Sequence, residues 1–218
     1  MPSRKSRATT RTSRATTRKS RTTTKTTKAV KKVTRTSKAK PKAKATKLKA
    51  KAAKTPSAAP VVAAGKIAPA FVLDSGSGER IALKDFRGKL VALYFYPKDM
   101  TPGCTIEACD FSDRLPEIEQ AGAVVLGVSP DSRESHIKFT AKHGLRFPLL
   151  ADVGAAVAKK YGVWQEKALY GRKFMGNVRT TFLIDREGRV ARVWRNVKVD
   201  GHADDVLASV RELAALPV

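Results

Sequence analysis

The sequence predicts an α/β fold with a central mixed β-sheet flanked by helices and preceded by a disordered basic tail. Apolar runs of strand length alternate with helical segments, and a strand–turn–strand pattern follows near the end of the chain. A change of composition near residue 62 separates this part from a segment of Lys, Arg, Thr, Ser and Ala. We therefore expect a tail over 1–62 and one folded domain over 63–218, which is long enough for a sizeable core.

The first half of the domain begins with short strands. Alternating apolar residues start at 65–73, and the Ser-Gly-Ser-Gly sequence of 75–78 predicts a turn between two short strands. Residues 84–88 predict a brief helical turn that ends at glycine. The nearly continuous apolar run over 90–96 is typical of a central strand covered on both faces.

A helix is predicted from about Cys104 to Arg114, where Pro116 is expected to interrupt or kink it. A second buried strand is expected at 123–129. The periodicity over 132–143 predicts another helix, and Gly144 supplies its stop signal.

The second half of the domain predicts a short strand at 147–150 and a short helix at 152–160. Residues 180–185 and 190–194 flank a polar turn containing glycine, which predicts a hairpin. An amphipathic helix over 202–213 closes the domain.

The net charge of the chain is +25, from 44 basic and 19 acidic residues, and most of it belongs to one end. The first 60 residues contain 21 Lys and Arg and no Asp or Glu. No apolar run is long enough to span a bilayer, and the first thirty residues lack the apolar region of a signal peptide. Two cysteines five residues apart are no disulfide framework, so we expect a soluble protein of a reducing compartment such as the cytoplasm, with no membrane partner.

The tail is a low-complexity segment in which the sequence of 6–11 recurs unchanged at 13–18. It has no aromatic residue and almost no aliphatic one, so burial cannot offset an ordering entropy of roughly 1 to 2 kcal/mol per residue. Its charge predicts sequence-independent binding to the phosphates of DNA, and association with the nucleoid, or with the nucleus in a eukaryote. The residues expected to bind nucleic acid are Arg4, Lys5, Arg7, Arg11, Arg14, Arg18, Lys19, Arg21, Lys31 and Lys32. A chloroplast-type targeting segment and a simple solubilising extension are the alternatives.

The residues before Cys104 predict an activated thiol. A cysteine at a helix N-terminus lies beside unpaired backbone amides at the positive end of the helix dipole, which favours the thiolate. Thr101 is placed to hydrogen-bond the sulfur or an incoming oxygen. Pro97 and Pro102 stiffen the turn, and Gly103 allows a close approach of the backbone.

The sequence Pro97-x-x-x-Thr101-x-x-Cys104 resembles the active-site motif of the peroxiredoxins. The longer stretch over 94–109 is similar to the bacterioferritin comigratory protein, or peroxiredoxin Q, subgroup. The resemblance continues through 127–129, 162–167 and 179–185, so that it covers residues 65 to 215 and leaves out the tail.

This resemblance implies a thioredoxin-like fold and a thiol peroxidase that reduces hydrogen peroxide or organic hydroperoxides. Cys104 would be the peroxidatic thiol, which becomes a sulfenic acid, and Cys109 the resolving thiol that condenses with it. Arg179 matches the active-site arginine of the family, where it would stabilise the thiolate and hold a peroxide oxygen. The resemblance also implies recycling by thioredoxin or a similar dithiol, a monomer, and no cofactor or metal.

The spacing of the two cysteines predicts movement. Five residues along an ideal helix separate two Cα atoms by about 8.6 Å, whereas a disulfide requires about 7 Å or less. If both thiols lie in one helix when reduced, its first turns must unwind to form the bond.

Other interpretations remain at this point. The two thiols could be structural, or the domain could be the redox-sensing part of a DNA-binding chromatin-like protein. Glu107 is interpreted as a stabiliser of the first helical turn and Asp99 as a turn residue. His136, His143 and His202 have no metal-ligand spacing to the thiols and are expected at the surface or in helix packing.

Overall fold

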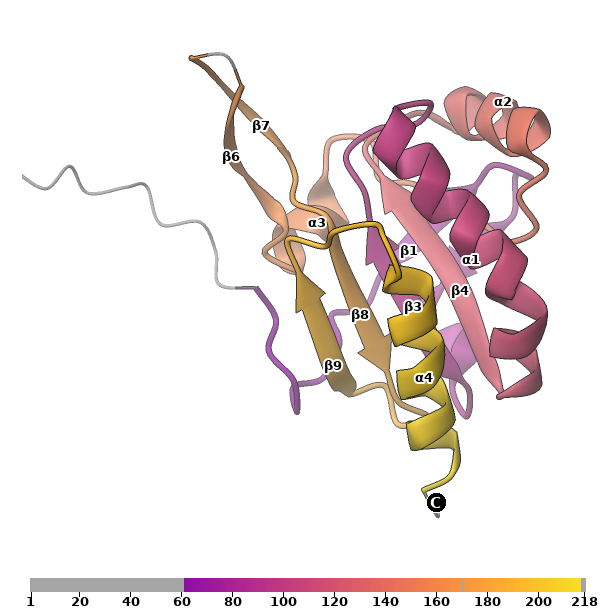
Figure 1. Ribbon diagram of the computed structural model, residues 1–218. Coiled ribbons are helices and arrows are strands. Elements are labelled where there is room, and N and C mark those ends of the chain that lie inside the picture. Colours follow the sequence, from indigo (N-terminus) through magenta and orange to yellow (C-terminus); the bar gives the residue numbers. More distant parts are fainter. Residues whose placement is uncertain (1–60, 170, 217–218) are drawn as a thin grey trace, which may run out of the picture. The chain divides into compact units, whose positions relative to one another are not determined.

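The computed structural model describes residues 61–169 and 171–216, which form a mixed β-sheet with helices on both faces (Figure 1). The sheet has seven strands. In spatial order they are β2 (Arg80–Ala82), β1 (Val72–Ser75), β5 (Leu149–Ala151), β4 (Ala123–Ser129), β3 (Leu90–Phe95), β8 (Thr180–Ile184) and β9 (Val190–Arg195). The ten residues predicted to bind nucleic acid lie outside the described residues.

The three central strands β5, β4 and β3 run parallel to one another, and the pairs β3–β8, β8–β9, β1–β5 and β1–β2 are antiparallel. This arrangement confirms the predicted mixed sheet and the late hairpin. The turn predicted over 75–78 lies between β1 and β2.

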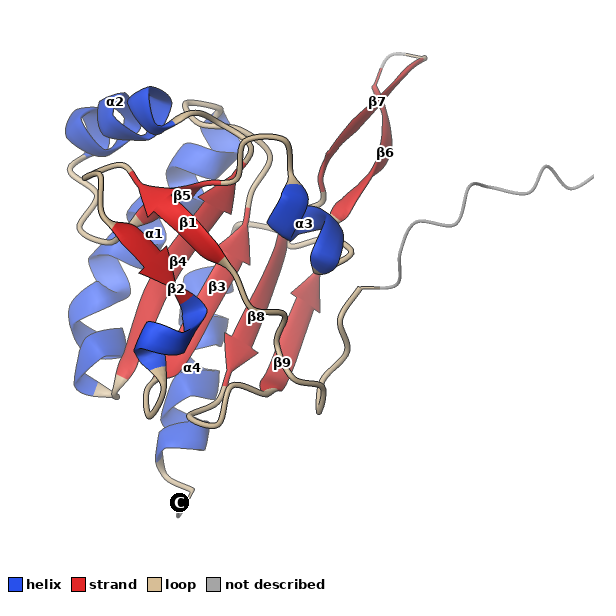
Figure 2. Ribbon diagram, turned by 180° about the vertical axis from the view of Figure 1, so that it is seen from behind, coloured by secondary structure: helices blue, strands red, loops and turns tan. Residues whose placement is uncertain are grey.

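Helices α1 (Pro102–Gln120) and α4 (His202–Ala214) pack side by side on one face of the sheet, whereas η1 (Leu83–Phe86) and α3 (Ala156–Lys160) lie on the other (Figures 1 and 2). Strand β3 contributes to both cores because its side chains alternate between the faces. Tyr94 belongs to the cluster under α1 and α4, and Phe95 to the opposite cluster. The expected central strand covered on both faces is thereby confirmed.

The expectation that Pro116 interrupts the first long helix was wrong, because α1 continues to Gln120. A proline has no amide hydrogen to donate to the carbonyl four residues earlier, which here belongs to Ser112. The guanidinium of Arg146 donates to that carbonyl instead. A contact from a distant part of the chain therefore satisfies the group that the proline leaves free.

Helix α2 (Arg133–His143) begins and ends where the sequence predicts. The hydroxyl of Ser132 accepts a hydrogen bond from the amide of Ser135 as an N-cap, and Gly144 adopts the left-handed conformation with φ 62°. Among the described helices, none is both long enough and apolar enough to cross a membrane.

A second hairpin, β6 (Trp164–Leu169) with β7 (Arg172–Asn177), was not predicted. It forms a separate two-stranded sheet that projects from the body of the domain (Figure 1). Its residues lack a regular alternation of apolar and polar side chains because little of the hairpin is buried. Phe174 and Met175, in the middle of β7, are exposed.

Candidate active site

Cys104 is the third residue of α1 and its side chain is buried, with 1% of its surface exposed. The chain leaves β3 at Phe95, forms a loop over 96–101, and enters α1 with Thr101 as N-cap and Pro102 at the first helical position. Proline suits this position because the missing amide would have had no partner there. The predicted location of Cys104 at the start of a helix is confirmed.

Arg179, from the segment just before β8, reaches the sulfur. Its Nη2 lies 3.2 Å from Cys104 Sγ, and its Nη1 donates to Glu107 Oε2. A Cβ on Gly103 would lie 3.4 Å from Arg179 Nη2, so the glycine leaves room for the guanidinium. Burial alone would lower the pKa of Arg179, but the negative charges of Glu107 and Cys104 raise it. A permanently charged donor therefore lies beside the thiol.

Glu107 is a member of this site that the sequence interpretation missed. Only 1% of it is exposed, and its Oε1 has no hydrogen-bond partner among the described residues. Burial raises its pKa to about 7, although Arg179 opposes the effect. The interpretation as a stabiliser of the first turn was wrong. One signal was present: Glu107 follows Cys104 by three residues and precedes Phe111 by four, which places a carboxylate on the buried face of the helix.

Replacing Glu107 with Gln is expected to change how stability depends on pH. The folded protein holds the Glu107 proton more tightly than the unfolded chain, so its contribution to the free energy of unfolding falls as pH rises from about 4.5 to about 7. At about 1.4 kcal/mol per tenfold change in proton affinity, the fall is on the order of 3 kcal/mol. Urea unfolding of the reduced wild type and variant across this range measures it. Parallel curves for the two proteins would contradict the shifted pKa.

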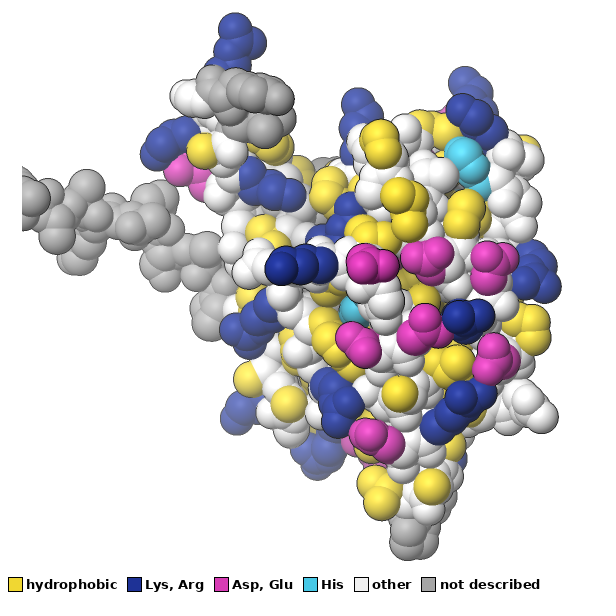
Figure 3. All heavy atoms as spheres, in the orientation of Figure 1, with side chains coloured by type: hydrophobic (Ala, Val, Ile, Leu, Met, Phe, Trp, Pro, Cys, Tyr) yellow, Lys and Arg dark blue, Asp and Glu magenta, His cyan; other side chains and the backbone are white. Residues whose placement is uncertain are grey.

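Cys109 lies in the same unbroken helix, five residues after Cys104, and is partly exposed. Both thiols are free. Burial raises the pKa of Cys109, and Asp113 and Asp110 raise it further. Figure 3 shows acidic side chains gathered over α1 and α4, the face to which these aspartates belong. The two predicted cysteines therefore lie in one helix and are not bonded to each other.

Pro97 and Thr101 lie in the loop that precedes Cys104, as predicted. The hydroxyl of Thr101 donates to the carbonyl of Lys98 at 3.0 Å, so the predicted hydrogen bond to sulfur is not formed in this structure. This hydrogen bond links residues 98 and 101 of the loop just before the helix begins.

Asp99 lies in a turn, as predicted, but the sequence did not show that its side chain is buried and hydrogen-bonded. It is 3% exposed and accepts hydrogen bonds from the Tyr96 hydroxyl, the Ser135 hydroxyl and the His136 ring. His202 is also buried, its Nε2 lies 2.7 Å from the Thr181 hydroxyl, and burial lowers its pKa to about 4. Both histidines therefore pack within the fold and not at its surface.

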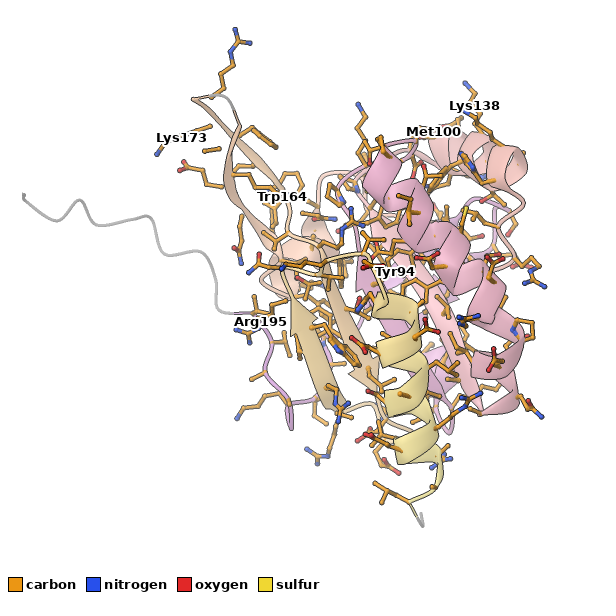
Figure 4. The ribbon with its side chains drawn as sticks, in the orientation of Figure 1. Tyr94, Met100, Lys138, Trp164, Lys173 and Arg195 are labelled. Carbon is orange, nitrogen blue, oxygen red and sulfur yellow. The ribbon has the colours of Figure 1, made fainter. Side chains whose placement is uncertain are left out.

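The base of the β6–β7 hairpin is tied to the site. Lys167 Nζ donates to the carbonyl of Asn177 at 2.8 Å, and the Asn177 side chain donates to the carbonyl of Tyr96 at 3.1 Å. Burial and the nearby charge of Arg179 lower the pKa of Lys167, while Cys104 opposes them. Trp164 lies at this base and Lys173 farther along the hairpin (Figure 4).

Comparison with known proteins gives consistent results. Residues 64–193 match the model of the AhpC/TSA family. Peroxiredoxin Bcp of Bacillus subtilis strain 168 is 47% identical over 150 residues, which cover 69% of this chain and 96% of that protein. Peroxiredoxin Bcp of Escherichia coli K12 is 44% identical over 151 residues, covering 69% and 97%.

Solved structures show the same relationship. Peroxiredoxin Q of Xanthomonas campestris superposes with a TM-score of 0.64 at 46% identity, covering 66% of this chain and 91% of that one. Peroxidoxin BcpB of Mycobacterium tuberculosis superposes with a TM-score of 0.63 at 35% identity, covering 70% and 98%. The family match begins at residue 64, just after the predicted tail.

Proposed function

The chain belongs to the AhpC/TSA family as a peroxiredoxin of the Bcp, or peroxiredoxin Q, group, and we propose that Cys104 is the thiol that its reaction oxidises. The protein is accordingly a thiol-dependent peroxidase with a thioredoxin-like fold. The observation that carries the proposal is the 3.2 Å contact between Cys104 Sγ and Arg179 Nη2 at a helix N-terminus. The positive end of the helix dipole and the guanidinium of Arg179 both favour the thiolate, which is the nucleophilic form.

In the first step the thiolate attacks one oxygen of the hydroperoxide. The S–O bond forms as the O–O bond breaks, and the oxygen that leaves takes a proton to become water or an alcohol. Arg179 is positioned to stabilise the negative charge that moves from sulfur to the leaving oxygen. Its second amino group stays on Glu107, which fixes the guanidinium without occupying the side that faces sulfur.

In the second step Cys109 attacks the sulfenic acid of Cys104, so that an S–S bond forms and water leaves. A dithiol reductant, which we propose to be thioredoxin, then reduces this disulfide by exchange. Since one chain carries both thiols, the cycle requires no second subunit, and we propose a monomer that works in the cytoplasm.

Thioredoxin recycling is tested by following peroxide-dependent oxidation of reduced thioredoxin in the presence of catalytic amounts of the full chain. We expect sustained turnover, and the same kcat/KM after deletion of residues 1–60, because the residues proposed for the chemistry lie between 97 and 179. Glutathione with glutaredoxin serves as the comparison. If Cys104 reacts with peroxide but thioredoxin is not oxidised, another reductant serves the enzyme.

We further propose that the tail binds DNA without sequence preference, which would hold the peroxidase near nucleic acid. Support comes from its 21 basic and zero acidic residues. The face formed by α1 and α4 is unsuited to a polyanion, since Asp110, Asp113, Asp200 and Asp204 lie together on it. A DNA-binding protein with a redox-sensing domain is the alternative, and it predicts DNA binding without peroxide turnover.

Binding of the tail to DNA should depend steeply on salt. Neutralising about eight phosphates predicts a slope near −7 for the logarithm of the binding constant against the logarithm of salt concentration. Deleting residues 1–60, or replacing the ten predicted Arg and Lys residues with Gln, should abolish or flatten this dependence in a gel-shift titration. Replacing the threonines of the same segment with Ser is the matched control. Binding that survives the deletion would contradict the proposal.

A further inference from the structure

Asp99 is held at the bottom of the loop between β3 and α1 by three donors. Its Oδ1 accepts from the Tyr96 hydroxyl at 2.7 Å, and its Oδ2 accepts from the Ser135 hydroxyl at 2.7 Å and lies 2.9 Å from His136 Nδ1. The side chains of Asp99 and His136 are 2% and 0% exposed. These hydrogen bonds lower the pKa of Asp99 despite its burial. The carboxylate is therefore charged and buried, and both of its oxygens accept hydrogen bonds.

The backbone of Asp99 is fixed as well. Its amide donates to Asp131 Oδ2 at 2.9 Å, and the same oxygen accepts from the Ser129 hydroxyl at 2.8 Å. Ser135 and His136 belong to the first turn of α2, and Ser129 ends β4. Two elements outside the loop thus anchor one of its residues. We name the group formed by Asp99, Tyr96, Ser135 and His136 the Asp99 latch.

Met100, the next residue, is in a left-handed conformation with φ 60°. A residue with a Cβ adopts it only at a cost in free energy, so the surroundings must impose it. The side chain of Met100 does not do so, since it is 41% exposed (Figure 4). The residues on either side are constrained: Asp99 by the latch, and Thr101 by its bond to Lys98 and its place as N-cap of α1.

We propose that Asp99 is a positioning residue of the peroxidase, whose latch holds Met100 in its left-handed conformation and so places the start of α1, with Cys104, opposite Arg179. The reversal of the chain at Met100 sets the direction in which α1 begins. Cys104 follows only four residues later, so a change at Met100 displaces its sulfur from the guanidinium. This inference rests on the proposed role of Cys104 and adds the group that aligns it.

A latch that only stabilised the fold would make a different prediction. Any loss of stability would then slow the enzyme equally, whichever residue caused it. A core variant such as Ile184→Val separates the two cases, because it lowers stability without touching the loop. Position 100 then shows whether the left-handed conformation matters, since Gly adopts a positive φ without the cost that Ala bears, while both remove the same exposed side chain.

The test measures how fast hydrogen peroxide oxidises Cys104, by dimedone trapping and mass spectrometry in full-length Cys109→Ser protein, so that no reductant is involved. Asp99→Asn should slow this step about 10- to 100-fold, the scale on which small misplacements act. Adding Met100→Gly to Asp99→Asn should give a rate about 5- to 30-fold above that with Met100→Ala. Ile184→Val, in the core at the opposite end of β3, is the control and should leave the rate unchanged.

A second measurement covers the case in which Asp99→Asn does not fold. In the otherwise unchanged chain, Met100→Gly should unfold about 2 to 8 °C above Met100→Ala. Equal rates for the Gly and Ala double variants, a wild-type rate for Asp99→Asn, or a lower Tm for Gly than for Ala would each overturn the latch. If Cys104 of the parent protein does not react with peroxide, the proposed function fails instead. The latch is then judged only from the Tm values of Met100→Gly and Met100→Ala.

Discussion

Replacing Cys104 with Ser is expected to abolish peroxide-dependent turnover, lowering kcat/KM by about 10³-fold or more. A serine hydroxyl in the same buried position has no accessible anionic form near neutral pH, so the charge of Arg179 has nothing to activate. The loss should be seen equally in consumption of peroxide and in oxidation of the reductant. The fold should be unchanged, because Ser fits the space of Cys at the third position of α1.

Cys109→Ser is the matched control for this experiment, since it alters the other thiol of the same helix. It should keep one rapid turnover, in which each chain reduces one molecule of peroxide and stops as a sulfenic acid. Steady-state turnover with thioredoxin should fall strongly because no disulfide is presented to the reductant. The two roles are reversed if Cys109→Ser, and not Cys104→Ser, loses the first turnover.

The sequence was sufficient for the elements that local signals specify. The apolar run of β3, the glycine that ends α2 and the glycine turn between β8 and β9 each carry their own signal, and all were confirmed. The placement of Cys104 at a helix start followed from the same kind of local pattern.

What the sequence did not predict depends on contacts between distant segments. Pro116 stays inside α1 because Arg146 satisfies the carbonyl of Ser112. Glu107 belongs to the site because Arg179, 72 residues later, donates to it. Asp99 is buried because α2 supplies Ser135 and His136 as donors. In each case a polar group finds its hydrogen-bond partner in a distant segment of the chain, and sequence spacing alone cannot identify that partner.

These distant contacts fall on both ends of α1, with Arg146 near Pro116 and the Asp99 latch on the loop before the first turn. Without an amide at Pro116, the turn that begins at Ser112 lacks one bond of the helical ladder, and Arg146 attaches this point to the body of the domain. Beyond it, Leu115 and Ile118 are buried in the core. The first turns, including Thr101 and Pro102 at the start of the helix, end in a loop that the Asp99 latch holds from the other side.

Oxidation of Cys104 and Cys109 to a disulfide is therefore expected to unwind the beginning of α1 and leave its end intact. Two Cα atoms five residues apart in a helix are about 8.6 Å from each other, beyond the reach of about 7 Å that a disulfide allows. Amide exchange over 105–109 should become about 100-fold faster or more in the oxidised protein, because the free energy of opening of these amides falls toward zero. Residues 115–120 should keep their protection. Peroxide-treated Cys109→Ser, which cannot form the bond, should exchange like the reduced wild type. Equal protection over 105–109 in both redox states would mean that the two thiols do not pair within this helix, and that Cys104 is resolved by another thiol.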